Sequence, residues 1–265
     1  MPRHLLSPPA TPGAQRRAVV IGLALVVGLA ALVISASAAS GNTSASSDSG
    51  GISAIFDPSD WYLTLPTGKK GDPDTVEMPK LADFSGNAFH LNDAKDGVVF
   101  TANAGGVTTS GSSYPRSELR EMDGNDHASW TNTHGTHTLT VRQAVTTLPK
   151  AKPEVVTAQI HDANDDVLEI RLEGSKLVAQ YNDGKTNVTL DAHYTLGTTY
   201  DLTLTASGGR VRVDYNGAKK LDIAKKGSGW YFKSGSYVQS NTSKGDKANA
   251  VAVVVIYRLA VKHSA

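Results

Sequence analysis

Apolar and polar side chains alternate with a period of two through most of the chain beyond residue 52. In Leu139–Thr147 the two kinds of side chain change places at each step, and Leu168, Ile170 and Leu172 alternate with charged neighbours. This period is typical of a strand with one buried face. The same pattern predicts strands over residues 155–161, 177–181, 200–204 and 211–215. Helical periodicity is nearly absent.

Tight turns separate these segments. Gly174-Ser175 and Gly208-Gly209 lie between consecutive apolar runs, and Asn216-Gly217 is the strongest short hairpin signal in the chain. The final segment, Ala250–Val261, is apolar on both faces until Arg258, as expected of a central strand in a two-sheet stack. Many short strands joined by close turns predict an all-β fold, a β-sandwich or jelly roll, with one concave face open to a polymer.

The first 51 residues have a different composition. Arg16 and Arg17 precede the apolar run Ala18–Ile34, and small residues follow at 36–38, so residues 1–38 predict a signal peptide. A run of this length also fits a membrane anchor, and both interpretations place the remainder outside the cytoplasm. Residues 39–51 are small and polar and predict a flexible linker. Residues 52–265 are long enough for one domain.

The charge balance argues against some partners. The chain has 26 Lys and Arg against 25 Asp and Glu, and removing Arg3, Arg16 and Arg17 with the signal peptide gives a formal charge of −2. A nearly neutral domain gives no support to nucleic-acid binding, so an anionic substrate must be recognised locally. The chain contains no cysteine, which excludes thiol chemistry and disulfides.

Two segments carry polar side chains suited to chemistry on one strand face. Alternation places Arg116, Glu118 and Arg120 together, opposite Ser117 and Leu119. In residues 155–161, Gln159 and His161 are expected on the open face, while the side chains expected in the core are Val156, Ala158 and Ile160. Taken alone, these patterns also fit a solvated ladder of charges and ordinary surface residues.

A third segment covers residues 231–239. Its polar face is expected to carry Tyr231, Lys233, Tyr237 and Gln239, with Phe232 and Val238 in the core. Taken alone, this pattern also fits an edge strand in which aromatic residues cover Gly235.

In this order, the three segments resemble the hallmark blocks of the alginate lyases of polysaccharide lyase family 7. The blocks stand here as Arg116-Ser117-Glu118-Leu119-Arg120, Gln159-Ile160-His161 and residues 231–239, with Ser234 where the family usually has Ala. Residues 60–66 are similar to the family's opening strand, so the resemblance runs from about Phe56 to the C-terminus. It implies a jelly roll of two antiparallel sheets and an endo-acting lyase that cleaves alginate by β-elimination.

The chemistry of that reaction assigns roles. The C5 hydrogen of a uronate lies beside a carboxylate, so its removal builds a second negative charge, which Arg116 and Gln159 are expected to spread. Neutral His161 suits the base near neutral pH. Tyr237 can give a proton to the leaving O4 or act as a base itself. The expected catalytic residues are therefore Arg116, Gln159, His161 and Tyr237.

The remaining polar residues of the blocks are expected to bind substrate. Arg120, Lys233 and Gln239 suit neighbouring carboxylates or hydroxyls, and Tyr231 shares their face. Glu118 is expected to orient the arginines, because a free carboxylate would repel a polyanion.

No cofactor or metal is expected. His127, His134 and His137 are interpreted as parts of a polar loop, because no acidic or thiol partner stands at ligand spacing. Residues 162–166 lack the glycine and the final glutamate of a calcium loop. The expected partner is alginate, an anionic polysaccharide, bound by a monomer that engages neither nucleic acid nor, once the signal peptide is removed, a membrane.

Alternatives remain at this level. A lyase for another polyuronate, such as a glucuronan, would use the same neutralisation of charge, and a non-catalytic carbohydrate-binding module could share the fold. A pure binder would not need His161 facing Tyr237. Within the resemblance, Ile160 between Gln159 and His161 is similar to members that accept guluronate-containing blocks, so a preference for such blocks is expected.

Overall fold

The computed structural model describes residues 50–265. The predicted signal peptide at residues 1–38 lies outside the described part, as does the predicted linker except for Gly50 and Gly51. In residues 50–265, no helix has the length and apolar character needed to cross a membrane.

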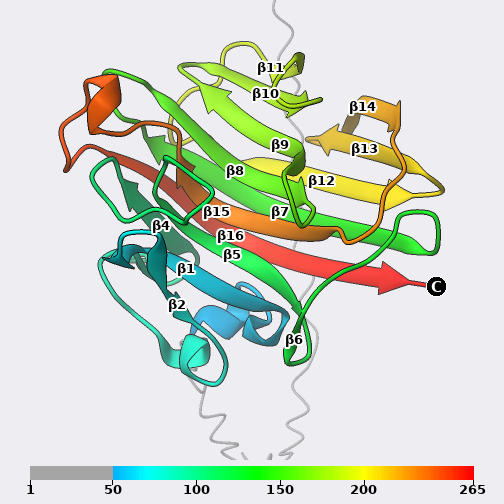
Figure 1. Ribbon diagram of the computed structural model, residues 1–265, viewed down its shortest axis with the longest axis horizontal. Coiled ribbons are helices and arrows are strands. Elements are labelled where there is room, and N and C mark those ends of the chain that lie inside the picture. The colour runs from blue at the N-terminus through cyan, green and yellow to red at the C-terminus, as the bar shows by residue number, and fades with distance from the viewer. Residues whose placement is uncertain (1–49) are drawn as a thin grey trace, which may run out of the picture. The chain divides into compact units, whose positions relative to one another are not determined.

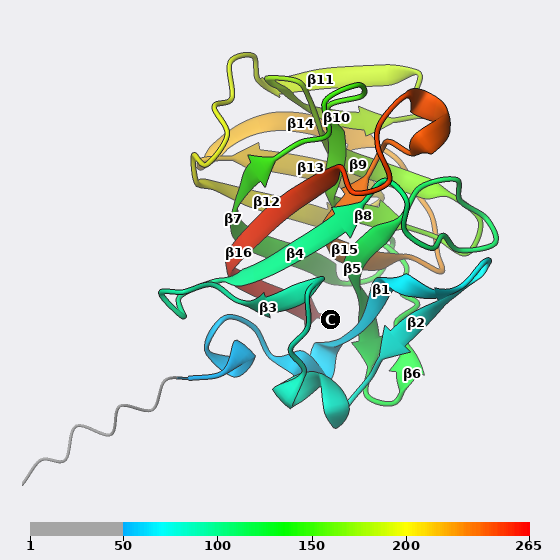
Figure 2. The same cartoon turned by 90° about the vertical axis from the view of Figure 1, so that its left-hand side faces the viewer.

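Two antiparallel sheets form the domain, and they lie face to face (Figures 1 and 2). The nine-stranded sheet runs in the order β11 (Thr186–Asp191), β10 (Lys176–Tyr181), β9 (Asp166–Glu173), β8 (Glu154–His161), β15 (Tyr231–Val238), β5 (Arg116–Asp123), β1 (Trp61–Lys69) and β2 (Asp72–Val76), with β6 (Asp126–His127) beside β5. The seven-stranded sheet runs in the order β14 (Ala218–Ala224), β13 (Arg210–Tyr215), β12 (Tyr200–Ser207), β7 (Thr136–Thr147), β16 (Val251–Ser264), β4 (Val98–Asn103) and β3 (Phe89–Leu91). The predicted jelly roll is confirmed.

Helical structure in the described chain is limited to four short 3₁₀ turns. They are η1 (Ile52–Ala54), η2 (Pro58–Asp60), η3 (Lys80–Asp83) and η4 (Thr242–Lys244). All four lie in connections between strands or before β1, so the two sheets make most of the core, to which η1 and η3 add Ile52 and Leu81.

The predicted turns and strands are found at the expected places. Gly174-Ser175 joins β9 to β10, Gly208-Gly209 joins β12 to β13, and Asn216-Gly217 joins β13 to β14. Asn216 and Gly217 both have positive φ, as an Asn-Gly hairpin turn requires. The apolar final strand is β16, which lies between β7 and β4 in the middle of its sheet.

The core fills the space between the sheets. The strands that carry the three hallmark blocks contribute Leu119, Ile160 and Phe232, which are fully buried, and the opposite sheet contributes residues such as Phe100 and Val254. Each apolar residue on these strands anchors the polar residues beside it, because successive side chains point to opposite faces. The core therefore fixes the outer face of the nine-stranded sheet, which is called the groove face below.

One core prediction is wrong. Val156 lies opposite Arg171 of β9 and Tyr237 of β15, on the groove face rather than in the core. The register of β8 against β9 shifts between Val156 and Ala158, so that Thr157 is an extra residue on β8. Such a bulge reverses the alternation on one side of it. Thr157 instead points inward, where its hydroxyl lies 3.2 Å from the Tyr200 hydroxyl.

The interpretation of three histidines as one polar loop also needs correction. His137 belongs to β7 and is buried, with its ring stacked on Trp130 at 4.3 Å between centroids. Its Nδ1 lies 2.7 Å from Nδ1 of His263 on β16. His127 is exposed on β6, and only His134 lies in a loop.

Candidate active site

One row of polar side chains crosses the groove face at right angles to the strands. Directly paired residues on neighbouring strands place in line Tyr62, Arg120, Lys233, Gln159, Glu169, Gln180 and Asn187, from β1 to β11. Neighbouring strands lie about 4.8 Å apart, so the row is a continuous polar surface across seven strands. It is called the transverse row below.

A cavity of about 330 Å³ opens over the middle of this row. The four predicted catalytic residues all line it, as do three of the predicted binding residues, Arg120, Tyr231 and Lys233. The segment 109–112 and the loop 163–165 complete its walls. The structure therefore brings the three hallmark blocks together around one space, because β5, β15 and β8 are neighbours in the sheet.

Glu118 connects the polar groups beneath this cavity. Its Oε2 lies 2.6 Å from Nζ of Lys233 and accepts a hydrogen bond from Nη1 of Arg116 at 2.9 Å. Its Oε1 accepts from Nε2 of Gln159 at 2.5 Å. Glu118 is 1% exposed, and of the two arginines that it is predicted to orient it contacts Arg116, whereas no hydrogen bond or ion pair joins it to Arg120 in the described chain.

The charges in this cluster support one another. Burial alone would raise the pKa of Glu118, but the Lys233 ammonium and the Arg116 guanidinium outweigh burial and hold its pKa below the usual value. Burial, with the nearby Arg116, lowers the pKa of Lys233 to about 8. At neutral pH, two cations therefore surround one carboxylate, and the cluster keeps a net positive charge toward the cavity.

His161 lies at the edge of the cavity at the end of β8. Its Nδ1 lies 2.5 Å from the carbonyl oxygen of Asp162 and 3.0 Å from the hydroxyl of Tyr231. Burial and the Lys233 ammonium lower the pKa of His161, so its ring is neutral near pH 7. A proton on Nδ1 is donated to the Asp162 carbonyl, which leaves a lone pair on Nε2. Nε2 has no hydrogen-bond partner among residues 50–265.

Tyr237 stands on β15, two paired positions along from Gly235. The guanidinium carbon of Arg116 lies 3.8 Å from the centre of its ring, and its hydroxyl lies 2.8 Å from Oγ of Ser112. Ser112 is fixed in turn by the main-chain N–H of Tyr114, which donates to Oγ at 3.0 Å. The phenol is therefore held between a cation and a hydroxyl, which fixes the position of its oxygen at the cavity.

Three other predicted binding residues do not all lie at the cavity. Arg120 lies over the ring of Tyr231, with 3.9 Å from the guanidinium carbon to the ring centre, and both line the cavity. Gln239 follows β15 and is 5% exposed, but it does not line the cavity. Its Nε2 lies 3.5 Å from the carbonyl oxygen of Tyr237.

Several residues of the cavity are not predicted by the sequence pattern. Thr64, Ser112, Asp166 and Glu169 line it as well. Glu169 had a usable signal, because the short turn from β8 to β9 forms a hairpin that places a groove-facing residue of β9 beside Gln159. Ser112 had no such signal in the sequence, since it lies in an irregular segment before β5.

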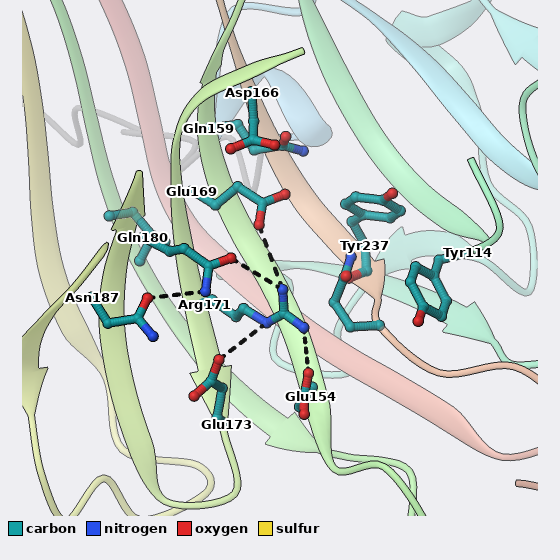
Figure 3. Close-up of polar contacts among 12 residues, drawn as sticks. Tyr114, Glu154, Gln159, Asp166, Glu169, Arg171, Glu173, Gln180, Asn187 and Tyr237 are labelled. Atoms are coloured by element: carbon teal, nitrogen blue, oxygen red, sulfur yellow. Dashed lines mark hydrogen bonds and ion pairs between the residues drawn. The ribbon is translucent and has the colours of Figure 1, made fainter. Parts of the chain in front are cut away.

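A second charged cluster lies beside the cavity on β8 and β9. Arg171 contacts Oε2 of Glu154, Oε2 of Glu169 at 3.7 Å and Oε1 of Glu173 at 3.4 Å, and it donates to Oε1 of Gln180 at 3.3 Å (Figure 3). Here three carboxylates surround one cation, which is the reverse of the arrangement around Glu118.

Comparisons with known proteins agree with one another. The family model described as alginate lyase matches residues 56–263. No match to a curated protein sequence was found. Among solved structures, the family 7 alginate lyase AlgAT5 is 49% identical with a TM-score of 0.78, over 81% of this chain and 99% of that one. An alginate lyase from Corynebacterium sp. is 42% identical with a TM-score of 0.78, over 81% and 98%.

A more distant structure contains a ligand. Family 7 alginate lyase A1-II′, in complex with the substrate GGMG, is 28% identical with a TM-score of 0.68, over 81% of this chain and 97% of that one. The family match therefore covers nearly all of the described domain, from residue 56 to residue 263.

Proposed function

Because the chain belongs to the alginate lyases of polysaccharide lyase family 7, we propose that it is a secreted, endo-acting enzyme that cleaves alginate by β-elimination and prefers guluronate-containing blocks. The observation that carries this proposal is the joint position of Arg116, Gln159, His161 and Tyr237 around one cavity, with Glu118 holding the first two.

In the proposed mechanism, Arg116 and Gln159 bind the carboxylate of the sugar that loses its C5 hydrogen. Glu118 uses one N–H of each, which leaves other N–H groups of the guanidinium and the amide for the substrate. These donors are fixed before the substrate arrives, so they stabilise the charge that develops on the carboxylate in the transition state.

The proton transfers are assigned to the residues on either side. Nε2 of neutral His161 takes the C5 proton, and the Tyr237 hydroxyl gives a proton to O4 as the C4–O4 bond breaks. The electron pair of the C5–H bond forms the C4=C5 double bond. The low pKa of His161 keeps the base unprotonated at neutral pH, and the contact with Ser112 orients the phenol.

One assay tests the activity and its main alternatives. We would incubate residues 39–265 with alginate, polyglucuronate and pectate and follow the ultraviolet absorbance of the new double bond. Absorbance is expected to rise on alginate. A rise on polyglucuronate alone would favour the glucuronan lyase, and no rise on any polymer would favour a binding module.

The preference for guluronate rests on stereochemistry. In guluronate the C5 hydrogen and O4 lie on opposite faces, which suits a base and an acid on separate strands, whereas Tyr237 could serve both roles for mannuronate. In the similar lyase A1-II′, the bound substrate is GGMG and the bound product is GGG, which supports a groove of this kind. A higher kcat/KM on polymannuronate than on polyguluronate would contradict the preference.

Endo-action and secretion need separate measurements. An endo-acting enzyme lowers the viscosity of an alginate solution well before most bonds are cut, and early products of one or two sugars would contradict it. For secretion, the chain recovered from the culture medium should begin near residue 39. A full-length, membrane-bound chain would favour the anchor.

A further inference from the structure

Glu169 is out of place in a cavity that binds a polyanion. It lies on β9, paired with Gln159 of β8 on one side and with Gln180 of β10 on the other. Its side chain lines the cavity with Gln159 and Lys233 and is nearly buried, at 7% exposure. Each other member of the transverse row carries an N–H or O–H that can donate a hydrogen bond. An ionised Glu169 would be the one member that can only accept.

The carboxyl group of Glu169 has few partners. The nearest cation is Arg171, at 3.7 Å from Nη1 to Oε2, and that guanidinium is shared with Glu154 and Glu173 (Figure 3). No hydrogen bond reaches the Glu169 carboxyl from any residue in the described chain. Glu118, at a similar depth, is instead compensated by Lys233, Arg116 and Gln159.

The charges that face Glu169 from each neighbouring element do not compensate for the lack of a hydrogen-bond donor to its carboxyl group. Glu118 is negative, as is Asp166 above its raised pKa of about 6. Arg171 and Lys233 are positive, but three carboxylates share Arg171. Burial, followed by the charge of Asp166, raises the pKa of Glu169 to about 7. The polar and titratable groups around it are Asp166 and Arg171 on β9, Gln159 and His161 on β8, Gln180 on β10, Glu118 on β5, Lys233 on β15 and Asp165 in the adjacent loop.

The protonation state decides what Glu169 can do for a polyuronate. As a carboxylate it repels the carboxylates of the substrate and offers them no donor. As a carboxylic acid it donates one O–H, which makes the transverse row a continuous line of donors from Tyr62 to Asn187. A sugar beside the one held at Gln159 would lie over this position, since adjacent strands are about 4.8 Å apart.

We propose that Glu169 binds alginate as a neutral carboxylic acid and donates a hydrogen bond to a carboxylate oxygen of the sugar next to the cleaved one. The inference rests on the proposed alginate-cleaving function of this cavity. Binding therefore weakens as pH rises through the titration of Glu169, because the apparent affinity falls with the fraction of the protein that is in the binding-competent state.

The test compares Glu169→Gln with the wild type between pH 6 and pH 7.5. In this window Lys233, with a pKa of about 8, keeps most of its charge, and any titration of His161, whose pKa is lowered, or of Asp166, whose pKa is about 6, is common to both proteins. For a group with a pKa of about 7, the wild-type KM on polyguluronate should rise about fourfold across the window. Gln cannot ionise and keeps a donor, so the KM of Glu169→Gln should stay flat.

A matched control lies on the same strand. Glu173 also contacts Arg171 but does not line the cavity, so Glu173→Gln should keep the wild-type pH profile of KM. Calorimetry in buffers of different ionisation enthalpy adds a direct readout. At pH 7.5, the wild type should take up a proton when it binds a guluronate oligosaccharide, and Glu169→Gln should take up less.

Two outcomes overturn the inference. One is a wild-type KM that stays constant or falls with pH, as an ionised acceptor of sugar hydroxyls would give. The other is the same rise in Glu169→Gln as in the wild type. Both require an active enzyme, so they are distinct from failure of the proposed function, which would appear as no new double bond at any pH.

Discussion

The groove face has two halves with opposite charge arrangements. On β5, β15 and the Gln159–His161 end of β8, the basic half, Glu118 lies among Arg116, Lys233 and Gln159. On β9 and the Glu154 end of β8, the acidic half, Arg171 lies among Glu154, Glu169 and Glu173. In each half the minority charge holds the others in place. The difference shows that this nearly neutral chain separates charge across one sheet, so its net charge says little about what one part of its surface can bind.

The largest effect is expected when the proposed base is removed from the edge of the basic half. His161→Ala should lower kcat on polyguluronate by a factor on the order of 10² to 10⁴, because no other described side chain replaces Nε2 beside the cavity. The initial rate of double-bond formation under saturating substrate measures it. Near wild-type turnover in this variant would remove His161 from the mechanism, and equal losses on polymannuronate would contradict the two-sided assignment with Tyr237.

A second change keeps the charge of the basic half and alters its shape. Arg116→Lys should lower kcat/KM by about 10² or more, since an ammonium cannot bind Glu118 and a substrate carboxylate through a planar fork. Arg116→Ala is the reference, measured in the same assay. If Lys restores most of the activity that Ala abolishes, charge alone is enough and the geometric argument is wrong.

The titration of Glu169 in the acidic half should make the free energy of unfolding depend on pH. Glu169 has a pKa of about 7 in the folded chain and about 4.5 when unfolded, so the unfolded state loses its proton first. The free energy of unfolding therefore falls as pH rises from about 4.5 to 7, by about 3 kcal/mol from this group. Glu169→Gln should gain that amount relative to the wild type between pH 4.5 and pH 8 in urea unfolding. A constant difference across this range would show that the carboxyl titrates normally.

The smallest effect is expected from the cation at the centre of the acidic half. Arg171→Met removes the partner that three carboxylates share, and should lower the free energy of unfolding by about 2 kcal/mol at pH 8. Arg142→Met breaks an exposed pair with Asp201 and should change it by no more than about 0.5 kcal/mol. Equal losses in the two variants would mean that the acidic half contributes no more than an ordinary surface ion pair.

Much of this fold could be predicted from the sequence, because a period of two and turn residues are local signals. The hairpin at Asn216-Gly217 and the central position of β16 followed from side chains close together in the chain. The position of Val156 on the groove face could not be predicted from local signals, because a bulge depends on how β8 pairs with its neighbours. The alternative of an edge strand for residues 231–239 failed for the same reason. β15 lies between β8 and β5, and nothing local specifies a strand's neighbours.

In the site, too, some residues could be predicted from the sequence and others could not. The resemblance identified the basic half residue by residue, and Arg116, Gln159, His161 and Tyr237 all line the cavity. From the sequence, Glu169 is only one of the charged neighbours of Leu168 and Ile170. Its depth and its place in the transverse row depend on six strand pairings, and alternation along one strand contains none of them.

Gly235 limits how this enzyme can be altered. It has a φ of +145°, and a Cβ at this position would lie 2.6 Å from the main-chain oxygen of Ser117 and 2.9 Å from Cα of Glu118. Any side chain there would push apart the two strands that carry Arg116 and Tyr237. In a library randomised along β15 and selected for alginate cleavage, neighbouring positions should accept several residues, while position 235 should return glycine alone.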